Sequence, residues 1–286
     1  MNAETILACA KVTLSLDVRP DSEPGWHQVD LVLHRIDAAD RLRLAPAPAA
    51  TFTVSGSDLT PREDNLAWKA LNLLSRVVGE EIPVHLTLEK EIPSGAGLGG
   101  GSADAAAVLT WGMSRYPRFR GALANQAGLL GMDVPFLTGV AGRAARATGR
   151  GADVEPLPPL AAGSLVVAYP GIQLSTKAVY EAFDAVGSPE PSASPGVVDA
   201  LKTHVIPFKL GNQLEHAAFH VAPDLAEFRT LLKRKGAPPA HTVMSGSGSS
   251  YVVWLSDHDE ALALAQALKR AHVPWVWAEQ LVRGGG

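Results

Sequence analysis

Five glycines fall within seven residues, between a segment that alternates like a strand and an alanine-rich segment typical of a helix. They are Gly95, Gly97, Gly99, Gly100 and Gly101. Glycine has no Cβ, so its backbone adopts positive φ angles and can approach a bound group closely. The unpaired N–H groups and the positive dipole end of the following helix attract anions. The sequence therefore predicts a phosphate-binding loop, because a merely flexible connection is unusual between a regular strand and an abrupt helix.

The common phosphate loops do not match this segment. Residues 95–100 satisfy G-x-G-x-x-G, but that pattern alone is weak, and a dinucleotide fold also needs an acidic residue about 20 positions further on. No Asp or Glu occurs between Asp104 and Asp133. A Walker A loop requires Gly-Lys-Ser/Thr, and this chain has Gly100-Gly101-Ser102 instead. Both readings are rejected.

The periodicity of the chain predicts an α+β protein. Residues 6–18 alternate as a half-buried strand, with Lys11 on the polar face. Neighbouring strands and grouped helices favour α+β over a regular βαβ series. Further strands are expected at 29–36, 84–89, 165–168, 242–244, 251–255 and 274–279. Helices are expected at 65–78, 103–111, 176–183, 223–235 and 257–271, with another from about 133 and a surface loop at 187–196. The Gly- and Pro-rich stretch 148–162 predicts a domain boundary, which gives domains 1–155 and 156–286.

Composition excludes several classes of protein. With 286 residues, 47% hydrophobic and 19% charged, the chain can bury a core and is not intrinsically disordered. A net charge of −4 gives no broad basic field for nucleic acid or anionic lipid. The single cysteine, Cys9, cannot form an internal disulfide and fits a reducing cytoplasm. No apolar run is long enough to span a membrane, and Glu4 stands where a signal peptide would be basic. A cytoplasmic protein with no nucleic-acid or membrane partner is expected.

The glycine loop, Pro93-Ser-Gly-Ala-Gly-Leu-Gly-Gly-Gly-Ser102, resembles the signature of the GHMP kinases, which are named for galactose, homoserine, mevalonate and phosphomevalonate. Other segments match in the family's order: Ala8-Cys9-Ala10-Lys11-Val12, Gly25-Trp26-His27, Asp64-Asn65-Leu66, Gly131-Met132-Asp133-Val134-Pro135-Phe136, Tyr169-Pro170-Gly171 and Met244-Ser-Gly-Ser-Gly-Ser-Ser250. The resemblance implies a two-domain GHMP-kinase fold, with an N-terminal ribosomal-protein-S5-like domain for ATP and a C-terminal ferredoxin-like α/β sandwich domain. The triple glycine, Gly-Trp-His and Gly-Met-Asp-Val-Pro point to the subfamily that phosphorylates the 2-hydroxyl of 4-diphosphocytidyl-2-C-methyl-D-erythritol, in non-mevalonate isoprenoid precursor synthesis.

The resemblance also implies roles for individual residues. Asp133 would orient or deprotonate the attacking hydroxyl, and Lys11 would polarise it; the alternatives are an N-cap and an exposed strand lysine. The residues implied for ATP are Pro93, Ser94, Gly95, Ala96, Gly97, Leu98, Gly99, Gly100, Gly101, Ser102, Ala103, Asn65, Leu66 and Lys90. The last three would border the adenine; the alternatives are a helix cap, a core leucine and a solvated lysine at the end of a strand. The residues implied for the substrate are Thr13, Trp26, His27, Tyr180, Gly246 and Gly248. Trp26 and Tyr180 would stack on the base, and His27 would hydrogen-bond its edge.

ATP with Mg²⁺ is the expected co-substrate. No carboxylate set for the metal is evident; Ser102 is one candidate ligand, and phosphates and water would supply most of the coordination. Thr13 stands where the family usually has Asn, which changes the hydrogen bonds offered to the substrate. The alternatives are another GHMP kinase, for homoserine, mevalonate or phosphomevalonate, or a non-catalytic binding protein of the same fold. A monomer or weak homodimer is expected.

Overall fold

The computed structural model describes residues 2–56, 62–139, 141–205 and 209–281. Contacts divide the chain into two compact units, each assembled from separate stretches of sequence. Unit 1 takes residues 1–11, 35–94 and 99–141, and unit 2 takes residues 12–34, 95–98 and 142–286. Strands β1 (Glu4–Pro20) and β2 (His27–Pro46) run through both units. The sequence-based boundary at 155/156 stays a prediction.

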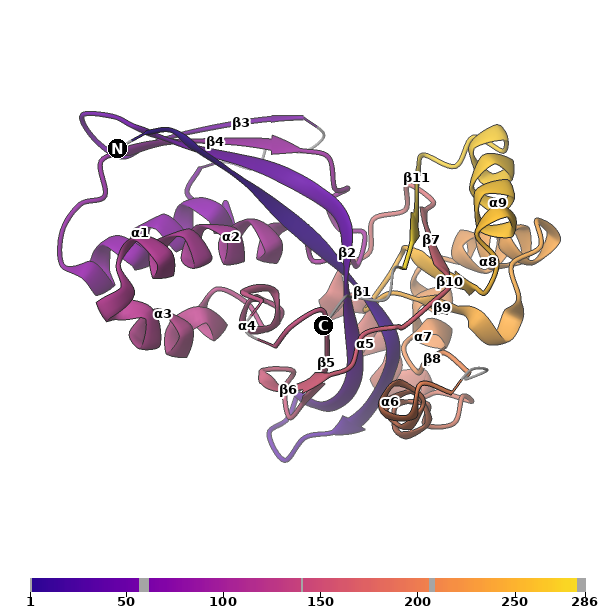
Figure 1. The fold of residues 1–286 in the computed structure, drawn as a ribbon. Coiled ribbons are helices and arrows are strands. Elements are labelled where there is room, and N and C mark those ends of the chain that lie inside the picture. The colour runs from indigo at the N-terminus through magenta and orange to yellow at the C-terminus, as the bar shows by residue number, and fades with distance from the viewer. Residues whose placement is uncertain (1, 57–61, 140, 206–208, 282–286) are drawn as a thin grey trace. The chain divides into compact units, whose positions relative to one another are not determined.

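Unit 1 packs helices on one face of its strands (Figure 1). Strand β4 (Val84–Lys90) pairs in parallel with β3 (Thr51–Gly56) and antiparallel with residues 41–46 of β2. Helices α1 (Leu66–Val78) and α2 (Gly100–Arg115) pack against each other. Its core includes Leu42, Leu44, Leu71, Leu74, Leu86, Leu88 and Val108. Burial of these side chains, at about 1.5–3 kcal/mol each, holds α2 and its N-terminus in place. The remaining elements of unit 1 are η1 (Pro117–Phe119), α3 (Arg120–Gln126), η2 (Ala127–Leu129) and α4 (Val134–Leu137).

Unit 2 contains an antiparallel sheet in the order β11-β7-β10-β9. Its strands are β7 (Ser164–Tyr169), β9 (Thr242–Met244), β10 (Tyr251–Leu255) and β11 (Trp275–Gln280). Helix α9 (His258–Arg270) contacts β7, β10 and β11. In the same unit, β5 (Ala144–Thr148) pairs with residues 31–34 of β2 and with β6 (Asp153–Leu157), and β8 (Gly211–Asn212) pairs with Ser15 and Leu16 of β1. The other elements are α5 (Thr176–Val186), α6 (Ser194–Thr203), α7 (Glu215–Val221), α8 (Asp224–Arg234) and η3 (Pro239–His241).

Most predicted elements are confirmed, and β9 and β10 have the predicted bounds. The prediction that the first strand is half-buried is wrong, because residues 10–18 of β1 are buried on both faces. Its polar face is covered by protein groups: Asp17 accepts hydrogen bonds from the Ser192 hydroxyl and from the backbone N–H groups of Ala193 and Ser194. Alternating polarity here marks a hydrogen-bonded interior and not a solvent face.

Several boundaries also differ from expectation. Helix α2 begins at Gly100, three residues before the predicted start, because glycines open it. The predicted surface loop 187–196 ends early, since Ser194 and Pro195 begin α6. The helix after Asp133 is only one turn, α4. The sequence did not predict β3, β5, β6, β8, α3, α6 or α7, and β6 lies inside the stretch predicted as a domain boundary.

Candidate active site

The N-terminus of α2 offers unpaired backbone donors. Gly99 occupies the N-cap position with φ 68° and accepts a hydrogen bond from the Ala103 N–H. Among the described residues no side chain caps this helix, and its first turn holds no acidic residue. The first N–H groups of a helix have no partner within it. In this 16-residue helix, those groups and the dipole end can therefore receive an anion.

Lys11 and Asp133 lie together beside this helix start. The distance from Lys11 Nζ to Asp133 Oδ2 is 3.5 Å, and the side chains are 5% and 31% exposed. A Cβ on Gly99 would lie 3.1 Å from Lys11 Cε and 3.4 Å from Asp133 Oδ2. Glycine thus lets the turn approach both side chains. Asp133 precedes α4 but makes no capping hydrogen bond in the part of the chain described, so the capping alternative fails. The exposed-lysine alternative fails because Lys11 is buried.

Lys90 lies in a buried cluster with two carboxylates. Its Nζ is 2.5 Å from Asp40 Oδ2 and 2.8 Å from Asp104 Oδ2. Asp40 Oδ1 also accepts hydrogen bonds from the backbone N–H groups of Glu91 and Ile92. The cluster therefore ties the end of β4 to the first turns of α2. A solvated lysine at the strand end, the alternative to a place beside the adenine, is excluded.

Burial shifts the titration of this cluster. It raises the pKa of Asp104 to about 8, although the Lys90 ammonium opposes that change. Burial alone would lower the pKa of Lys90, but the charges of Asp104 and Asp40 raise it. Asp104 Oδ1 is buried and has no hydrogen-bond partner among the described residues. Sequence reading missed both carboxylates, because they lie 50 and 14 positions from Lys90 in the chain.

The two residues predicted near the adenine lie at the start of α1. Asn65 Oδ1 accepts a hydrogen bond from the Ala67 N–H at 2.9 Å, so this side chain caps α1. Leu66 is partly exposed, and its Cδ1 would lie 3.5 Å from a Cβ on Gly101. Leu66 therefore borders the N-terminus of α2, and Ser102 follows in that first turn. A nucleotide role for these residues remains a prediction.

In unit 2, residues 95–98 of the glycine loop pack against a second glycine turn. The Ser245 hydroxyl donates to the Gly97 carbonyl at 2.9 Å and accepts from the Thr13 N–H at 3.1 Å. The Ser250 N–H donates to the Ala96 carbonyl. A Cβ on Gly97 would lie only 2.2 Å from the Ser245 carbonyl oxygen, so glycine is required there. Ser245 lies in the segment 244–250 that resembles the GHMP kinases, and in the structure it joins β1 to the glycine loop.

Other polar groups of unit 2 surround this turn. Gly246 and Gly248 have φ values of 58° and 93°. Asn212 donates its side-chain amide to the carbonyls of Met244 and Gly246, which holds the turn. Thr13 Oγ1 is buried without a hydrogen-bond partner among the described residues. A buried unpaired hydroxyl is costly; a substrate role for Thr13 remains a prediction.

The predicted base-binding residues of unit 2 are partly brought together. Rings of His27 and Tyr180 are 4.8 Å apart between centroids, with a 40° interplanar angle. His27 Nε2 lies 2.6 Å from Asp184 Oδ1, one turn after Tyr180 on α5. Trp26 is 45% exposed and is therefore not a core tryptophan. Sequence reading missed Asp184, whose spacing of four from Tyr180 on a helix was the available signal.

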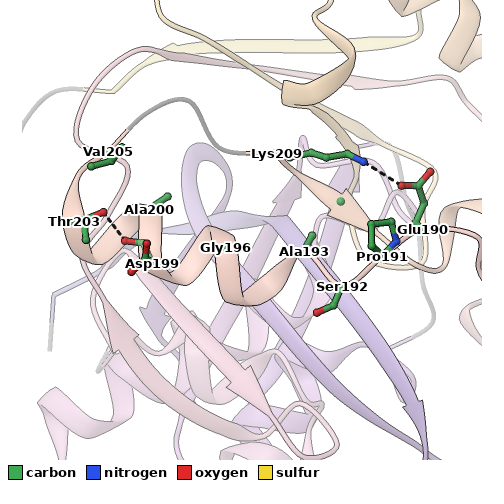
Figure 2. A pocket seen from close by; sticks show the side chains of 11 residues that line it. Glu190, Pro191, Ser192, Ala193, Gly196, Asp199, Ala200, Thr203, Val205 and Lys209 are labelled. Atoms are coloured by element: carbon green, nitrogen blue, oxygen red, sulfur yellow. Dashed lines mark hydrogen bonds and ion pairs between the residues drawn. The ribbon is translucent and has the colours of Figure 1, made fainter.

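A cavity of about 340 Å³ in unit 2 lies by α6 and is lined by other residues (Figure 2). Its charged groups include Lys209 and Glu190, whose side chains are 3.4 Å apart and pair with each other. The residues around it are Glu190, Pro191, Ser192, Ala193, Gly196, Asp199, Ala200, Thr203, Val205, Lys209 and Gly211. None of the predicted catalytic, ATP-binding or substrate-binding residues lines this cavity.

Within the described ranges, no group of three or more His, Cys, Asp or Glu side chains could hold a metal ion. In those ranges, no helix has the length and apolarity needed to cross a bilayer.

Comparison with known proteins identifies the family. Residues 65–138 match the GHMP kinases N terminal domain. The chain is 37% identical over 279 residues to the 4-diphosphocytidyl-2-C-methyl-D-erythritol kinase of Pelotomaculum thermopropionicum, covering 93% of this chain and 94% of that one. A solved 4-(cytidine 5'-diphospho)-2C-methyl-D-erythritol kinase is 36% identical with a TM-score of 0.81, covering 99% of this chain and 100% of that one.

A solved homoserine kinase from Cytophaga hutchinsonii shares the fold, with a TM-score of 0.69 and 16% sequence identity. The match covers 99% of this chain and 96% of the homoserine kinase chain. The predicted α+β GHMP-kinase fold is confirmed by these structures. Because the similarity to its relatives extends over nearly its full length, the chain belongs to the 4-diphosphocytidyl-2-C-methyl-D-erythritol kinase family of the GHMP kinases.

Proposed function

We propose that this protein transfers the γ-phosphoryl group of ATP to the 2-hydroxyl of 4-diphosphocytidyl-2-C-methyl-D-erythritol. The observation that carries the proposal is the Lys11–Asp133 pair, 3.5 Å apart, at the glycine that opens α2. Phosphoryl transfer uses these parts in one place: an anion-binding loop, a cation and a group that takes a proton. Family membership supports the identity of the acceptor.

Asp133 is the group proposed to take the proton. The acceptor oxygen forms a bond to the γ-phosphorus, the bond from that phosphorus to the β–γ bridging oxygen breaks, and ADP leaves. The hydroxyl proton passes to the Asp133 carboxylate, which is 31% exposed and so open to a ligand. Lys11, buried beside it, orients the acceptor oxygen and offsets the negative charge that develops there.

The glycine loop and the N-terminus of α2 are proposed to hold the ATP phosphates. The backbone donors at residues 100–102 face no capping side chain among the described residues. Mg²⁺ bound with ATP would neutralise phosphate charge. The described residues contain no group of three or more His, Cys, Asp or Glu side chains that could hold it. Phosphate oxygens and water would therefore supply most of its ligands, and Ser102 is the protein hydroxyl offered at the helix start.

The aromatic residues of unit 2 are proposed to recognise the cytosine base. Trp26 and Tyr180 provide stacking surfaces. In neutral His27, the carboxylate of Asp184 keeps the proton on Nε2, so Nδ1 is an acceptor. The exocyclic amine of cytosine is a donor, whereas the corresponding uracil oxygen is an acceptor. This pairing favours cytosine over uracil.

Purified protein and a coupled assay for ADP release test the proposal against a panel of acceptors. The panel contains 4-diphosphocytidyl-2-C-methyl-D-erythritol, homoserine, mevalonate and phosphomevalonate. We expect turnover only with the first. Turnover with an aliphatic acceptor alone would contradict the assigned substrate, and nucleotide binding without turnover of any acceptor would favour a non-catalytic protein.

The remaining expectations concern setting and assembly. A reducing cytoplasm suits a chain whose one cysteine, Cys9, cannot form an internal disulfide. We propose a monomer or weak homodimer that binds small molecules. The net charge of −4 again favours the absence of nucleic-acid and membrane partners. Sedimentation measurements at several concentrations would test the assembly state.

A further inference from the structure

Trp26 presents its indole at the surface of unit 2, where one charged side chain covers it. The residue is 45% exposed, and the guanidinium carbon of Arg150 lies 4.4 Å from the ring centroid. A guanidinium at this distance is held by the negative face of the ring. One face of the indole is therefore occupied by protein, and a flat ligand has the opposite face on which to stack.

Two carboxylates fix the Arg150 guanidinium. Its Nε is 3.2 Å from Asp21 Oδ2, and its Nη2 is 3.3 Å from Asp21 Oδ1 and 2.6 Å from Glu23 Oε2. The side chain of Asp21 is only 3% exposed, and the Arg150 hydrogen bonds are the main reason that its pKa is held well below the usual range. A planar guanidinium held through Nε and Nη2 by two carboxylates keeps one orientation.

Backbone hydrogen bonds connect the same carboxylates to Trp26. In the turn of residues 21–26, the Asp21 N–H donates to the Trp26 carbonyl and the Trp26 N–H donates to the Glu23 carbonyl. Asp21 Oδ1 also accepts the Glu23 N–H at 3.0 Å. Asp21 and Glu23, which bind Arg150, thus belong to the same turn as Trp26. The Arg150 guanidinium, the two carboxylates and the indole therefore form one connected unit.

Arg150 itself lies in the turn between β5 and β6, far from Trp26 in the sequence. The preceding Gly149 has φ 65°, and its carbonyl accepts the Val29 N–H at 2.7 Å. This bond anchors the Arg150 turn to β2, three residues after Trp26. Arg150 therefore approaches the indole from a fixed hairpin.

From this arrangement we propose that Arg150 is a positioning residue for substrate binding: held by Asp21 and Glu23, it fixes the plane of Trp26 so that a pyrimidine base can stack on the other face. The inference rests on the proposed function, since it assigns that base to the cytidyl substrate. Arg150 acts through Trp26 and is not placed in contact with the reacting atoms.

The test compares Arg150→Ala with a matched control, Arg146→Ala. Arg146 lies on the same hairpin, forms a two-point ion pair with Asp30 at 2.8 and 2.6 Å, and is 32% exposed against 34% for Arg150. We expect Arg150→Ala to raise the KM for the cytidyl substrate about fivefold to tenfold, as loss of an ordered stacking surface implies. We expect kcat and the KM for ATP to stay within about twofold, and Arg146→Ala to leave all three constants within about twofold.

A double-mutant cycle separates positioning from general stability. In a Trp26→Ala background, Arg150→Ala should cause little further rise in KM, because the ring on which it acts is gone. Arg150→Lys, which keeps a cation but loses the fork, should fall between wild type and Arg150→Ala. An effect of Arg150→Ala that persists undiminished without Trp26, or that equals the effect of Arg146→Ala, would overturn the proposal.

Measuring the affinity for CDP by calorimetry tests the role of Arg150 without relying on turnover. Wild type should bind CDP about fivefold to tenfold more tightly than Arg150→Ala, and the melting temperatures of the two alanine variants show whether both are folded. A wild type that binds CDP but turns over none of the acceptors would contradict the proposed function while leaving the Arg150 comparison measurable. A wild type that binds no CDP would overturn the inference about Arg150.

Discussion

Two lysine–carboxylate clusters in unit 1 lie beside successive glycines at the start of α2, and their geometry differs. Lys11 Nζ and Asp133 Oδ2 are 3.5 Å apart, and the aspartate is 31% exposed. Lys90 Nζ lies within 2.5 and 2.8 Å of two carboxylates that are 0% and 2% exposed. A Cβ on Gly99 would crowd the first cluster, and a Cβ on Gly100 would come 3.3 Å from Lys90 Nζ.

The difference distinguishes a pair suited to chemistry from a cluster suited to support. A loose ion pair with one exposed carboxylate can exchange its contact for a ligand group. A buried ammonium held between the Asp40 carboxylate and the Asp104 carboxyl group has no such freedom, since removing Lys90 or Asp40 leaves a buried charge uncompensated. Lys90 thus supports α2, and the lysine proposed to meet the substrate is Lys11.

The largest expected effect is that of Asp133→Asn. The amide keeps the shape of the carboxylate but cannot take the hydroxyl proton, so kcat should fall about 10²–10⁴-fold. ATP binding, measured by calorimetry, should change little, because the phosphates are assigned to the α2 N-terminus. Near-normal turnover would remove Asp133 from the proposed role and would abolish the contrast between the two clusters.

Replacing each lysine by Met should distinguish the two clusters by the loss of stability and of turnover that each replacement causes. Lys90→Met leaves the buried Asp40 and Asp104 without their cation, and the free energy of unfolding should drop by about 3–5 kcal/mol. Lys11→Met, beside a partly exposed aspartate, should lower that free energy by less than about 2 kcal/mol and instead abolish most turnover. Urea unfolding and the ADP-release assay measure both quantities. Equal losses of stability in the two variants would contradict the distinction.

The smallest expected effect is a pH dependence from Asp104. Its pKa is raised by burial from 3.8 to about 8, so the folded state retains a proton that the unfolded state has lost. The resulting stabilisation is complete below about pH 4 and is lost as the pH rises toward 8. Asp104→Asn cannot ionise, so its stability relative to wild type should improve by on the order of 2 kcal/mol between pH 5.5 and pH 7.

Urea unfolding at the two pH values measures this difference. A relative stability that is flat with pH would show that Asp104 is ionised in the fold at both values. Asp199→Asn, on the exposed face of α6, is the matched control and should show no comparable trend.

Sequence reading located much of the fold because its signals are local. Alternation of apolar residues marked β1 and β4, short apolar segments marked β9 and β10, and the Asn65 cap marked the start of α1. It missed α6 and α7, which are short and depend on packing within unit 2. The half-buried reading of β1 failed because polarity was taken for exposure. The side chain of Asp17 looks like a solvent-facing group in sequence, yet residues 192–194, which lead into α6, satisfy it with hydrogen bonds in the fold.

The residues predicted for the site could be named from motifs, but their partners could not. No local pattern around Lys90 predicts its ion pair with Asp40, 50 positions away. No local pattern around Trp26 predicts its contact with Arg150. Such pairs form when strands and turns from distant segments of the chain come into contact. Periodicity and motif spacing describe only local sequence, so they do not predict these contacts.

The sequence by itself determined the glycine loop, the helix that follows it and the residue types available for phosphoryl transfer, because backbone freedom and local periodicity are written in neighbouring residues. Only the tertiary structure decided which lysine lies beside Asp133 and which is buried between two carboxylates. The physical reason is that the behaviour of a charge depends on its distance to other charges and to water, and the fold sets both distances.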